Sequence, residues 1–157
     1  MRSSALEDRL ARLEDEKAIL HLKYQYAAYC DTGYDLDGFR SIFTPNGRWA
    51  ANGFGTFTGH DEICRFFEEL SATVVQVLHY VTSPRITVAD DGRTATGDFY
   101  LLCLSRSRDR GNLSVVDSVA TMGTYEDRFV KLADRWLIEE MKVNVGHVAK
   151  IPPFKRS

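Results

Sequence analysis

The fold is decided by the last part of the chain, where residues 93–145 read RTATGDFYLLCLSRSRDRGNLSVVDSVATMGTYEDRFVKLADRWLIEEMKVNV. β-Branched and aromatic residues recur throughout this stretch, which is typical of long strands. Asp91-Gly92 is a strong hairpin turn just before it, and Ala133-Asp134 is a weaker turn inside it. The predicted strands of the second half are 74–82, 85–89, 93–105, 114–130 and 135–145.

The first half of the chain has helical periodicity instead. Apolar residues at alternating steps of three and four predict a long amphipathic helix over residues 4–30, which Asp31-Thr32-Gly33 ends. Its expected inward side chains are Leu6, Leu10, Leu13, Leu20, Tyr24 and Ala27. The other predicted elements are helices at 35–43 and 60–70, a turn at Pro45-Asn46-Gly47, and a hairpin of short strands at 48–51 and 54–58.

Helices followed by a long antiparallel meander are typical of an α+β domain rather than a parallel α/β fold. A strongly curved sheet around a long helix would form a cone that is open at one end, and such a mouth is a usual place for a small-molecule pocket. We expect one domain over residues 1–157, with residues 147–157 as a peripheral tail because Pro152-Pro153 and basic residues follow the last strand.

Composition excludes several classes of protein. The 157 residues carry 20 Lys and Arg against 22 Asp and Glu, a net charge of −2, so no general attraction to nucleic acid or anionic membrane is expected. No apolar stretch is long enough to span a bilayer. The charged N-terminus lacks the apolar region of a secretory signal, and Cys30, Cys64 and Cys103 show no CxxC spacing, so we expect a reducing, cytoplasmic setting.

The signatures of several catalytic classes are missing from the sequence. It contains no GxSxG elbow and no GxxxxGK[ST] phosphate loop. Its four histidines are scattered without HxH, HxxxH or HExxH spacing, so no metal site is predicted.

Asp31 and His79 are ionisable residues in apolar surroundings. Asp31 continues the inward series of the first helix, and His79 shares a strand face with Val77 and Val81. A buried carboxylate and a buried imidazole can offset each other's desolvation, which would leave the second ring nitrogen available as a general base. From these residues alone, a helix-ending turn aspartate and a structural histidine are the more ordinary interpretations.

Three segments carry a family resemblance: YAAYCDTGYDLDGFRSIFTPNGRWAANGFGTFTGHDEI (residues 26–63), LHYVTSPRITV (78–88) and YEDRFVKLADRWLIE (125–139). Together the chain resembles the SnoaL-like branch of the NTF2-like superfamily over about residues 6–145. Within that branch it is most similar to hexachlorocyclohexane dehydrochlorinase, scytalone dehydratase and bile acid 7α-dehydratase. These enzymes use an Asp–His dyad without metal or organic cofactor.

The resemblance implies a cone-shaped barrel, with a long N-terminal helix and two shorter helices packed in a strongly curved, mainly antiparallel sheet. It also implies catalytic roles for Asp31, His79 and Tyr26, with Tyr26 assisting the leaving group. Helical geometry sets Tyr26 about 140° around the axis from Asp31. The expected pocket residues are Trp49, Phe54, Tyr80, Cys103 and Asn144; Cys103 and Asn144 stand where relatives carry other polar groups.

The function expected from the resemblance is that of a lyase without cofactor or metal, a dehydratase or dehydrohalogenase for a small, apolar, cyclic substrate. An isomerase or cyclase that uses the same base is the second enzyme alternative. A non-catalytic module, binding a small ligand or serving as an oxygenase small subunit, is the third alternative. We also expect a homo-oligomer, a trimer or a dimer, because one face of such a sheet is apolar and needs cover.

Overall fold

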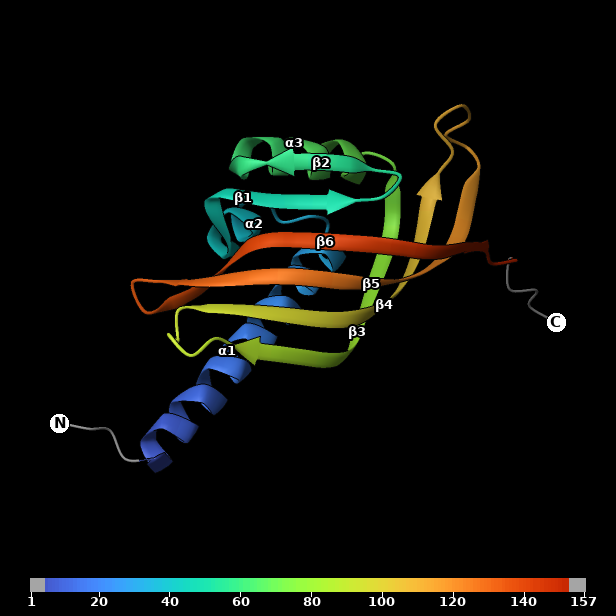
Figure 1. Ribbon diagram of the computed structural model, residues 1–157. Coiled ribbons are helices and arrows are strands. Elements are labelled where there is room, and N and C mark those ends of the chain that lie inside the picture. Colours follow the sequence, from blue (N-terminus) through green and yellow to red (C-terminus); the bar gives the residue numbers. More distant parts are fainter. Residues whose placement is uncertain (1–4, 153–157) are drawn as a thin grey trace.

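The computed structural model describes residues 5–152, which form a curved sheet with helices packed on its inner side (Figure 1). The elements in chain order are α1 (Ala5–Asp31), α2 (Leu36–Ile42), β1 (Phe43–Ala51), β2 (Gly55–Thr58), α3 (Gly59–Ser71), β3 (Val74–Val88), β4 (Thr94–Arg108), β5 (Val116–Leu132) and β6 (Arg135–Lys150).

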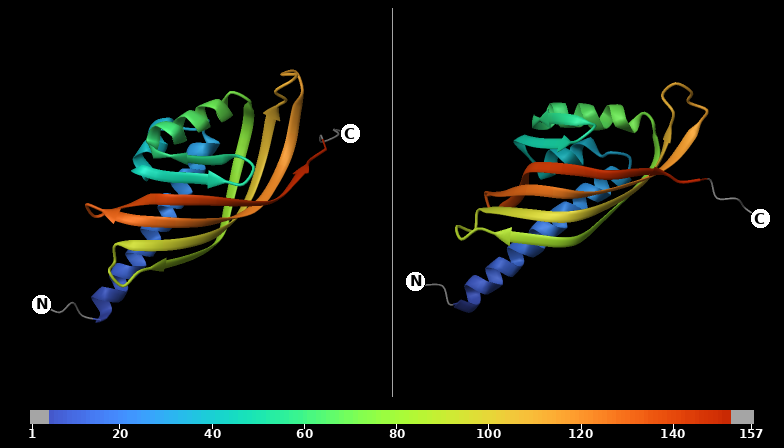
Figure 2. Two further views of the ribbon diagram at one scale, coloured as in Figure 1. Left: turned by 45° about the horizontal axis from the view of Figure 1, so that its top comes forward. Right: turned by 45° about the vertical axis from the view of Figure 1, so that its right-hand side comes forward.

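The sheet has the strand order β2-β1-β6-β5-β4-β3. All neighbouring strands run antiparallel except β1 and β6, which are parallel. Because β2 pairs only with β1 and β3 pairs only with β4, the two edges do not meet. Both views of Figure 2 show β3, β4 and β5 bending along their length. The α+β class is therefore confirmed, but the expected barrel is an open, curved sheet.

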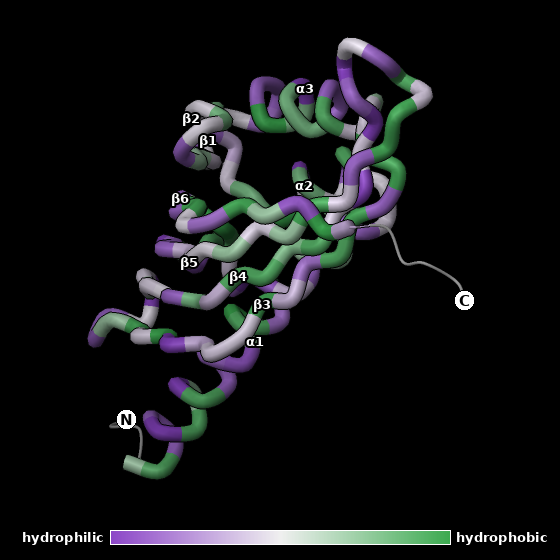
Figure 3. Tube along the Cα trace, turned by 90° about the vertical axis from the view of Figure 1, so that its right-hand side faces the viewer, coloured by the Kyte–Doolittle hydropathy of each residue, from purple (hydrophilic) through white to green (hydrophobic). Residues whose placement is uncertain are grey.

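The inward face of α1 differs from the prediction. Leu6, Leu10 and Leu13 are exposed, because the first turns of α1 extend toward the outside of the sheet (Figures 1 and 3). Tyr24, farther along the helix, is 45% exposed. The second half of the helix lies mainly against β3 and carries the buried residues. These are Ile19, Leu22, Lys23, Tyr26, Ala27 and Cys30.

The structure joins the strands predicted at 74–82 and 85–89 into the single strand β3. A register irregularity lies between Thr82 and Arg85, next to Ser83 with a φ of 53°. The local kink therefore bends the strand instead of ending it.

Strands β1 and β6 are both longer than predicted. β1 begins at Phe43 and runs through the expected turn, with its register shifting between Phe43 and Arg48. β6 continues to Lys150, and Val148 pairs with Thr121 on β5. The tail predicted at 147–157 therefore begins as strand, and residues 153–157 lie outside the described residues.

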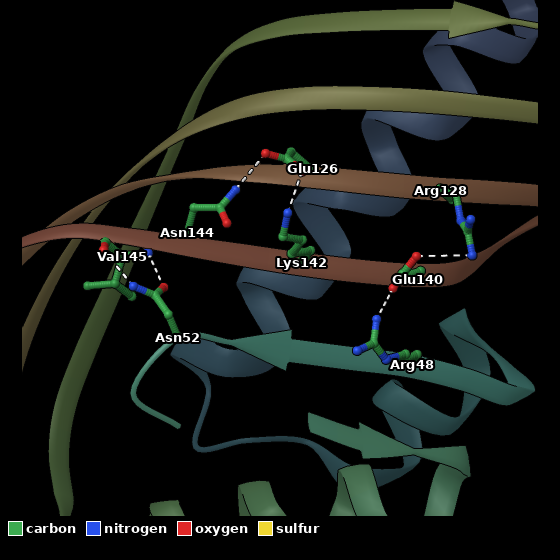
Figure 4. A network of polar contacts seen from close by, with 8 residues as sticks. All are labelled: Arg48, Asn52, Glu126, Arg128, Glu140, Lys142, Asn144 and Val145. Atoms are coloured by element: carbon green, nitrogen blue, oxygen red, sulfur yellow. Dashed lines mark hydrogen bonds and ion pairs between the residues drawn. The ribbon is translucent and has the colours of Figure 1, made fainter. Parts of the chain in front are cut away.

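The outer face of the sheet has a polar half and an apolar half. In Figure 4, side chains of β1, β5 and β6 form a polar network on the side facing away from α1; Glu140 binds both Arg48 and Arg128. Toward the other edge, β3, β4 and β5 place Tyr80, Leu102 and Met122 side by side, all more than one third exposed. The homo-oligomer expected from sequence stays a prediction.

Candidate active site

A cavity of about 290 Å³ lies between the inner face of the sheet and the helices. Aromatic side chains of α3 and β1 form one wall, where Trp49 packs against Phe66 with 4.8 Å between their ring centroids. Strands β3 to β6 form the opposite wall. The lining is mostly apolar and includes Tyr26, Cys30, Tyr34, Trp49, His79 and Cys103.

Asp31 and His79 meet at the edge of this cavity. His79 lies on the edge strand β3, so its backbone N–H points away from the sheet and has no strand partner. Asp31 ends α1 beside it and accepts this N–H with both carboxylate oxygens, at 3.0 and 3.1 Å. The carboxylate also binds the ring, with Oδ1 2.7 Å from His79 Nδ1. One carboxylate therefore holds both the backbone and the imidazole of His79.

The same contact determines the charge of His79. Burial alone opposes the charged imidazolium, but the hydrogen bond to Asp31 and the interaction with Cys103 outweigh it and raise the pKa of His79 to about 9. Nδ1 is occupied by Asp31, while the ring itself lines the cavity. The arrangement can therefore present Nε2 to a bound molecule, as an acid when protonated and as a base when neutral.

Tyr26 reaches the cavity from α1 and is fixed by a second hydrogen bond. Its hydroxyl accepts the indole N–H of Trp49 at 2.9 Å. Burial raises the pKa of Tyr26 well above its ordinary value, so the phenol stays neutral and keeps its proton as a donor. Tyr26 and His79 both line the cavity although Asp31 does not. The angular offset between Tyr26 and Asp31 is thus compatible with one site, because Asp31 acts from behind the imidazole.

Most, but not all, of the predicted pocket residues lie in the cavity wall. Trp49, Phe54 and Cys103 line it. Tyr80 is 48% exposed on the outer face, because it follows His79 and successive strand residues point to opposite sides. Asn144 also faces outward, where it donates to Glu126 at 2.8 Å, while its neighbours line the cavity (Figure 4). The predictions for Tyr80 and Asn144 are therefore wrong.

Tyr34, one of the aromatic residues that the sequence offers as pocket lining, does line the cavity. Cys30, interpreted from sequence as a small buried residue, lines it as well, and its position four residues after Tyr26 on α1 could have indicated this. Sequence reasoning missed a fully buried ion pair between Lys23 Nζ and Asp127 Oδ2, 2.8 Å apart. Lys23 lies one turn before Ala27, so its position on the buried face was readable, but its partner on β5 was not.

Within 5–152, no three His, Cys, Asp or Glu side chains gather where they could hold a metal ion. No helix in that range is long and apolar enough to cross a membrane.

A known family covers most of the chain. The profile of a family described as a SnoaL-like domain matches residues 11–142. The chain belongs to this SnoaL-like family. A sequence comparison with curated proteins gives no match.

Solved structures show the same fold at low sequence identity. Hexachlorocyclohexane dehydrochlorinase type 3 from Novosphingobium barchaimii is 18% identical, with 95% of this chain and 98% of that chain covered and a TM-score of 0.81. A protein of Novosphingobium aromaticivorans provisionally named a scytalone dehydratase is 16% identical, with 92% of each chain covered and a TM-score of 0.76. A Streptomyces avermitilis protein provisionally named a dehydratase of the NTF2-like family is 16% identical, with 85% and 97% covered and a TM-score of 0.71. These likenesses confirm the NTF2-like fold.

Proposed function

We propose that this SnoaL-like protein is a lyase that needs no cofactor, a dehydratase or dehydrohalogenase for a small, uncharged, cyclic substrate. The observation that carries the proposal is the Asp31–His79 contact at the wall of an apolar cavity. The names of the solved relatives, which include a dehydrochlorinase, support the reaction class.

His79 is the proposed general base. Its neutral form takes a proton from substrate carbon through Nε2, and Asp31 stabilises the imidazolium that results. Asp31 is a positioning residue, because it binds the ring and the backbone of His79 from behind and does not itself line the cavity.

Tyr26 is the proposed donor to the leaving group. Elimination places negative charge on a departing hydroxyl oxygen or halide, and a neutral phenol held by Trp49 can donate a hydrogen bond to it. The electron pair of the broken carbon–hydrogen bond forms the new π bond, and the bond to the leaving group breaks with its electron pair going to the hydroxide or halide. The proton on His79 then passes to the leaving hydroxide or to solvent.

The cavity wall supports an uncharged substrate. Among the described residues that line it there is no Lys, Arg, Asp or Glu, and the one cation, protonated His79, is already paired with Asp31. A charge buried there without a partner would cost several kcal/mol. Aromatic and aliphatic side chains instead favour an apolar ring.

An isomerase is the second candidate, because two phenols face the same cavity. Tyr34 also lines it, and burial raises its pKa, so Tyr26 and Tyr34 could both donate to an enolate oxygen. Elimination changes the mass of the substrate and isomerisation does not, so mass analysis of the product separates the two. A non-catalytic module is the third alternative. The open space beside His79 counts against an oxygenase small subunit with a filled interior, but it fits a small-ligand-binding module.

The test is turnover of 3-hydroxycyclohexanone and of hexachlorocyclohexane, followed by ultraviolet absorbance of the enone and by halide release. We expect His79→Ala and Asp31→Asn each to lower kcat/KM by about 100-fold or more, the usual share of a general base. His147→Ala is the matched control, because His147 is exposed on β6.

The control should keep full activity, and circular dichroism should show that all three variants are folded. Wild-type turnover of either probe that survives both substitutions would refute the dyad. Turnover of neither probe, together with exchange of substrate protons for deuterium that needs His79, would favour the isomerase.

A further inference from the structure

Cys103 is the direct cross-strand neighbour of His79. The two residues are paired between β3 and β4, and both line the cavity. Because the N–H of His79 points to Asp31 and not to β4, the pair is of the type without hydrogen bonds between the strands. Facing side chains lie closest in such pairs. A thiol, an imidazole and a carboxylate therefore follow one another from Cys103 on β4 through His79 on β3 to Asp31 at the end of α1.

The other two cysteines lack this setting. Cys30 is 1% exposed, and burial raises its pKa far above the ordinary value of a thiol. Cys64 is also buried, burial raises its pKa, and its thiol donates to the backbone oxygen of Leu36 at 3.6 Å, away from the cavity. Cys103 is partly accessible and has an imidazole beside it. The chain thus contains its own internal comparison for thiol reactivity.

We propose that Cys103 is a second reactive site of this cavity, where its thiol adds to uncharged α,β-unsaturated carbonyl compounds with His79 as its base. The step is balanced without any co-reactant. The sulfur forms a bond to the β-carbon, the carbon–carbon π bond breaks, and the thiol proton passes through His79 to the α-carbon. His79 ends as it began, and nothing is oxidised or reduced.

The shape and polarity of the cavity select this ligand class. A volume of about 290 Å³ admits a small ring, and the apolar wall disfavours charged electrophiles. Tyr26 and Tyr34 line the same space and can donate to the carbonyl oxygen, which would stabilise the enolate formed by addition. The inference goes beyond the proposed lyase reaction, because addition needs no leaving group.

The experiment uses 2-cyclohexen-1-one with the purified protein and follows the intact mass. We expect one adduct of one cyclohexenone mass, located at Cys103 by peptide mapping. Cys103→Ser should abolish it. An excess of cyclohexanone, the saturated analogue, should slow the addition without forming an adduct, because it occupies the cavity but has no electrophilic carbon.

The role of His79 is tested by the rate. His79→Gln should slow the addition at Cys103 on the order of 100-fold, since general-base assistance is lost. The circular dichroism spectrum of His79→Gln should match that of wild type, which reports that the fold is intact. An adduct mainly at Cys30 or Cys64, no protection by cyclohexanone, or equal rates in wild type and His79→Gln would each overturn the proposal. Halide release from hexachlorocyclohexane, which forms no enone, tests the lyase proposal separately, so either proposal can fail while the other holds.

Discussion

Among the acid–base pairs that join helix α1 to the sheet, Lys23–Asp127 and Asp31–His79 differ in solvent access. Lys23 and Asp127 are fully buried, while Asp31 and His79 have side chains 22% and 11% exposed. The two helix residues lie about two turns apart on α1. The first pair is enclosed by protein, with Lys23 Nζ 3.1 Å from the ring centroid of Tyr125, and the second borders the cavity.

The contrast shows that burial and pairing by themselves do not make a reactive site. Burial lowers the pKa of Lys23 to about 8 against the attraction of Asp127, and burial raises the pKa of Asp127 to about 6 against the attraction of Lys23. Both shifts oppose ionisation, as expected where desolvation outweighs the attraction between the charges. The Asp31–His79 contact instead raises the pKa of His79. Only this second pair presents an atom to a bound molecule.

The largest effect should come from breaking the buried pair. Lys23→Met leaves Asp127 as an uncompensated buried charge, with one oxygen, Oδ1, already lacking a hydrogen-bond partner. We expect a loss of about 3–5 kcal/mol in the free energy of unfolding, measured by urea denaturation. Lys142→Met is the matched control, because Lys142 and Glu126 form an exposed pair and should contribute less than about 1 kcal/mol.

The double variant Lys23→Met/Asp127→Leu sharpens this result. Removing both charges also removes their desolvation, so the double variant should recover most of the lost stability. A double variant less stable than Lys23→Met would mean that the pair stabilises the fold outright, contrary to the pKa directions.

The sequence predicted the reactive pair better than the buried one. Asp31 and His79 could be found because each is ionisable, lies at an identifiable end or face of an element, and matches a family pattern. Lys23 and Asp127 lie in otherwise ordinary segments, 104 residues apart, and only the register between β5 and β6 and the packing of α1 bring them together. Long-range partners of single charged residues are not encoded in local periodicity.

The errors have local physical causes. Leu6, Leu10 and Leu13 satisfy helical periodicity, but the sheet does not reach them, and periodicity does not show where packing ends. Aromatic character and family position favour Tyr80 and Asn144 as pocket residues, but strand alternation opposes both. His79 lines the cavity beside Tyr80, and the neighbours of Asn144 do so on β6.

The next effect is the response to pH, which differs in direction between the Asp31–His79 pair and the Lys23–Asp127 pair. Proton abstraction needs neutral His79, and its pKa is raised to about 9 by the contacts with Asp31 and Cys103 despite burial. We therefore expect kcat/KM to rise about tenfold per pH unit above neutrality and to level off near pH 9. The measurement is the pH–rate profile of wild type, and a profile already flat at pH 7 would contradict the assignment.

The contribution of His79 to the free energy of unfolding should fall over the same pH range in which kcat/KM rises. The folded pKa of His79 lies above the unfolded value of 6.5, so its stabilisation is complete below about pH 6.5 and is lost as the pH rises through about 9. Lys23 has a lowered pKa, so between about 8 and 10.5 its contribution should favour the fold as pH rises. Comparing wild type with His79→Ala by thermal melts at pH 6.5 and pH 9 isolates the first contribution.

The smallest effect should come from the hydrogen bond that fixes Tyr26. Trp49→Phe keeps an aromatic ring beside Phe66 but removes the N–H that Tyr26 accepts. One lost hydrogen bond corresponds to about 1 kcal/mol, or roughly a fivefold decrease in kcat/KM if Tyr26 assists the leaving group. Trp136→Phe is the matched control, because Trp136 also donates a hydrogen bond, to Asp15 at 2.8 Å, but lies outside the cavity wall. Equal activity in both tryptophan variants would remove Tyr26 from the proposed mechanism and leave the Asp31–His79 pair as its entire support. A decrease confined to Trp49→Phe would place the leaving group on the α1 side of the cavity.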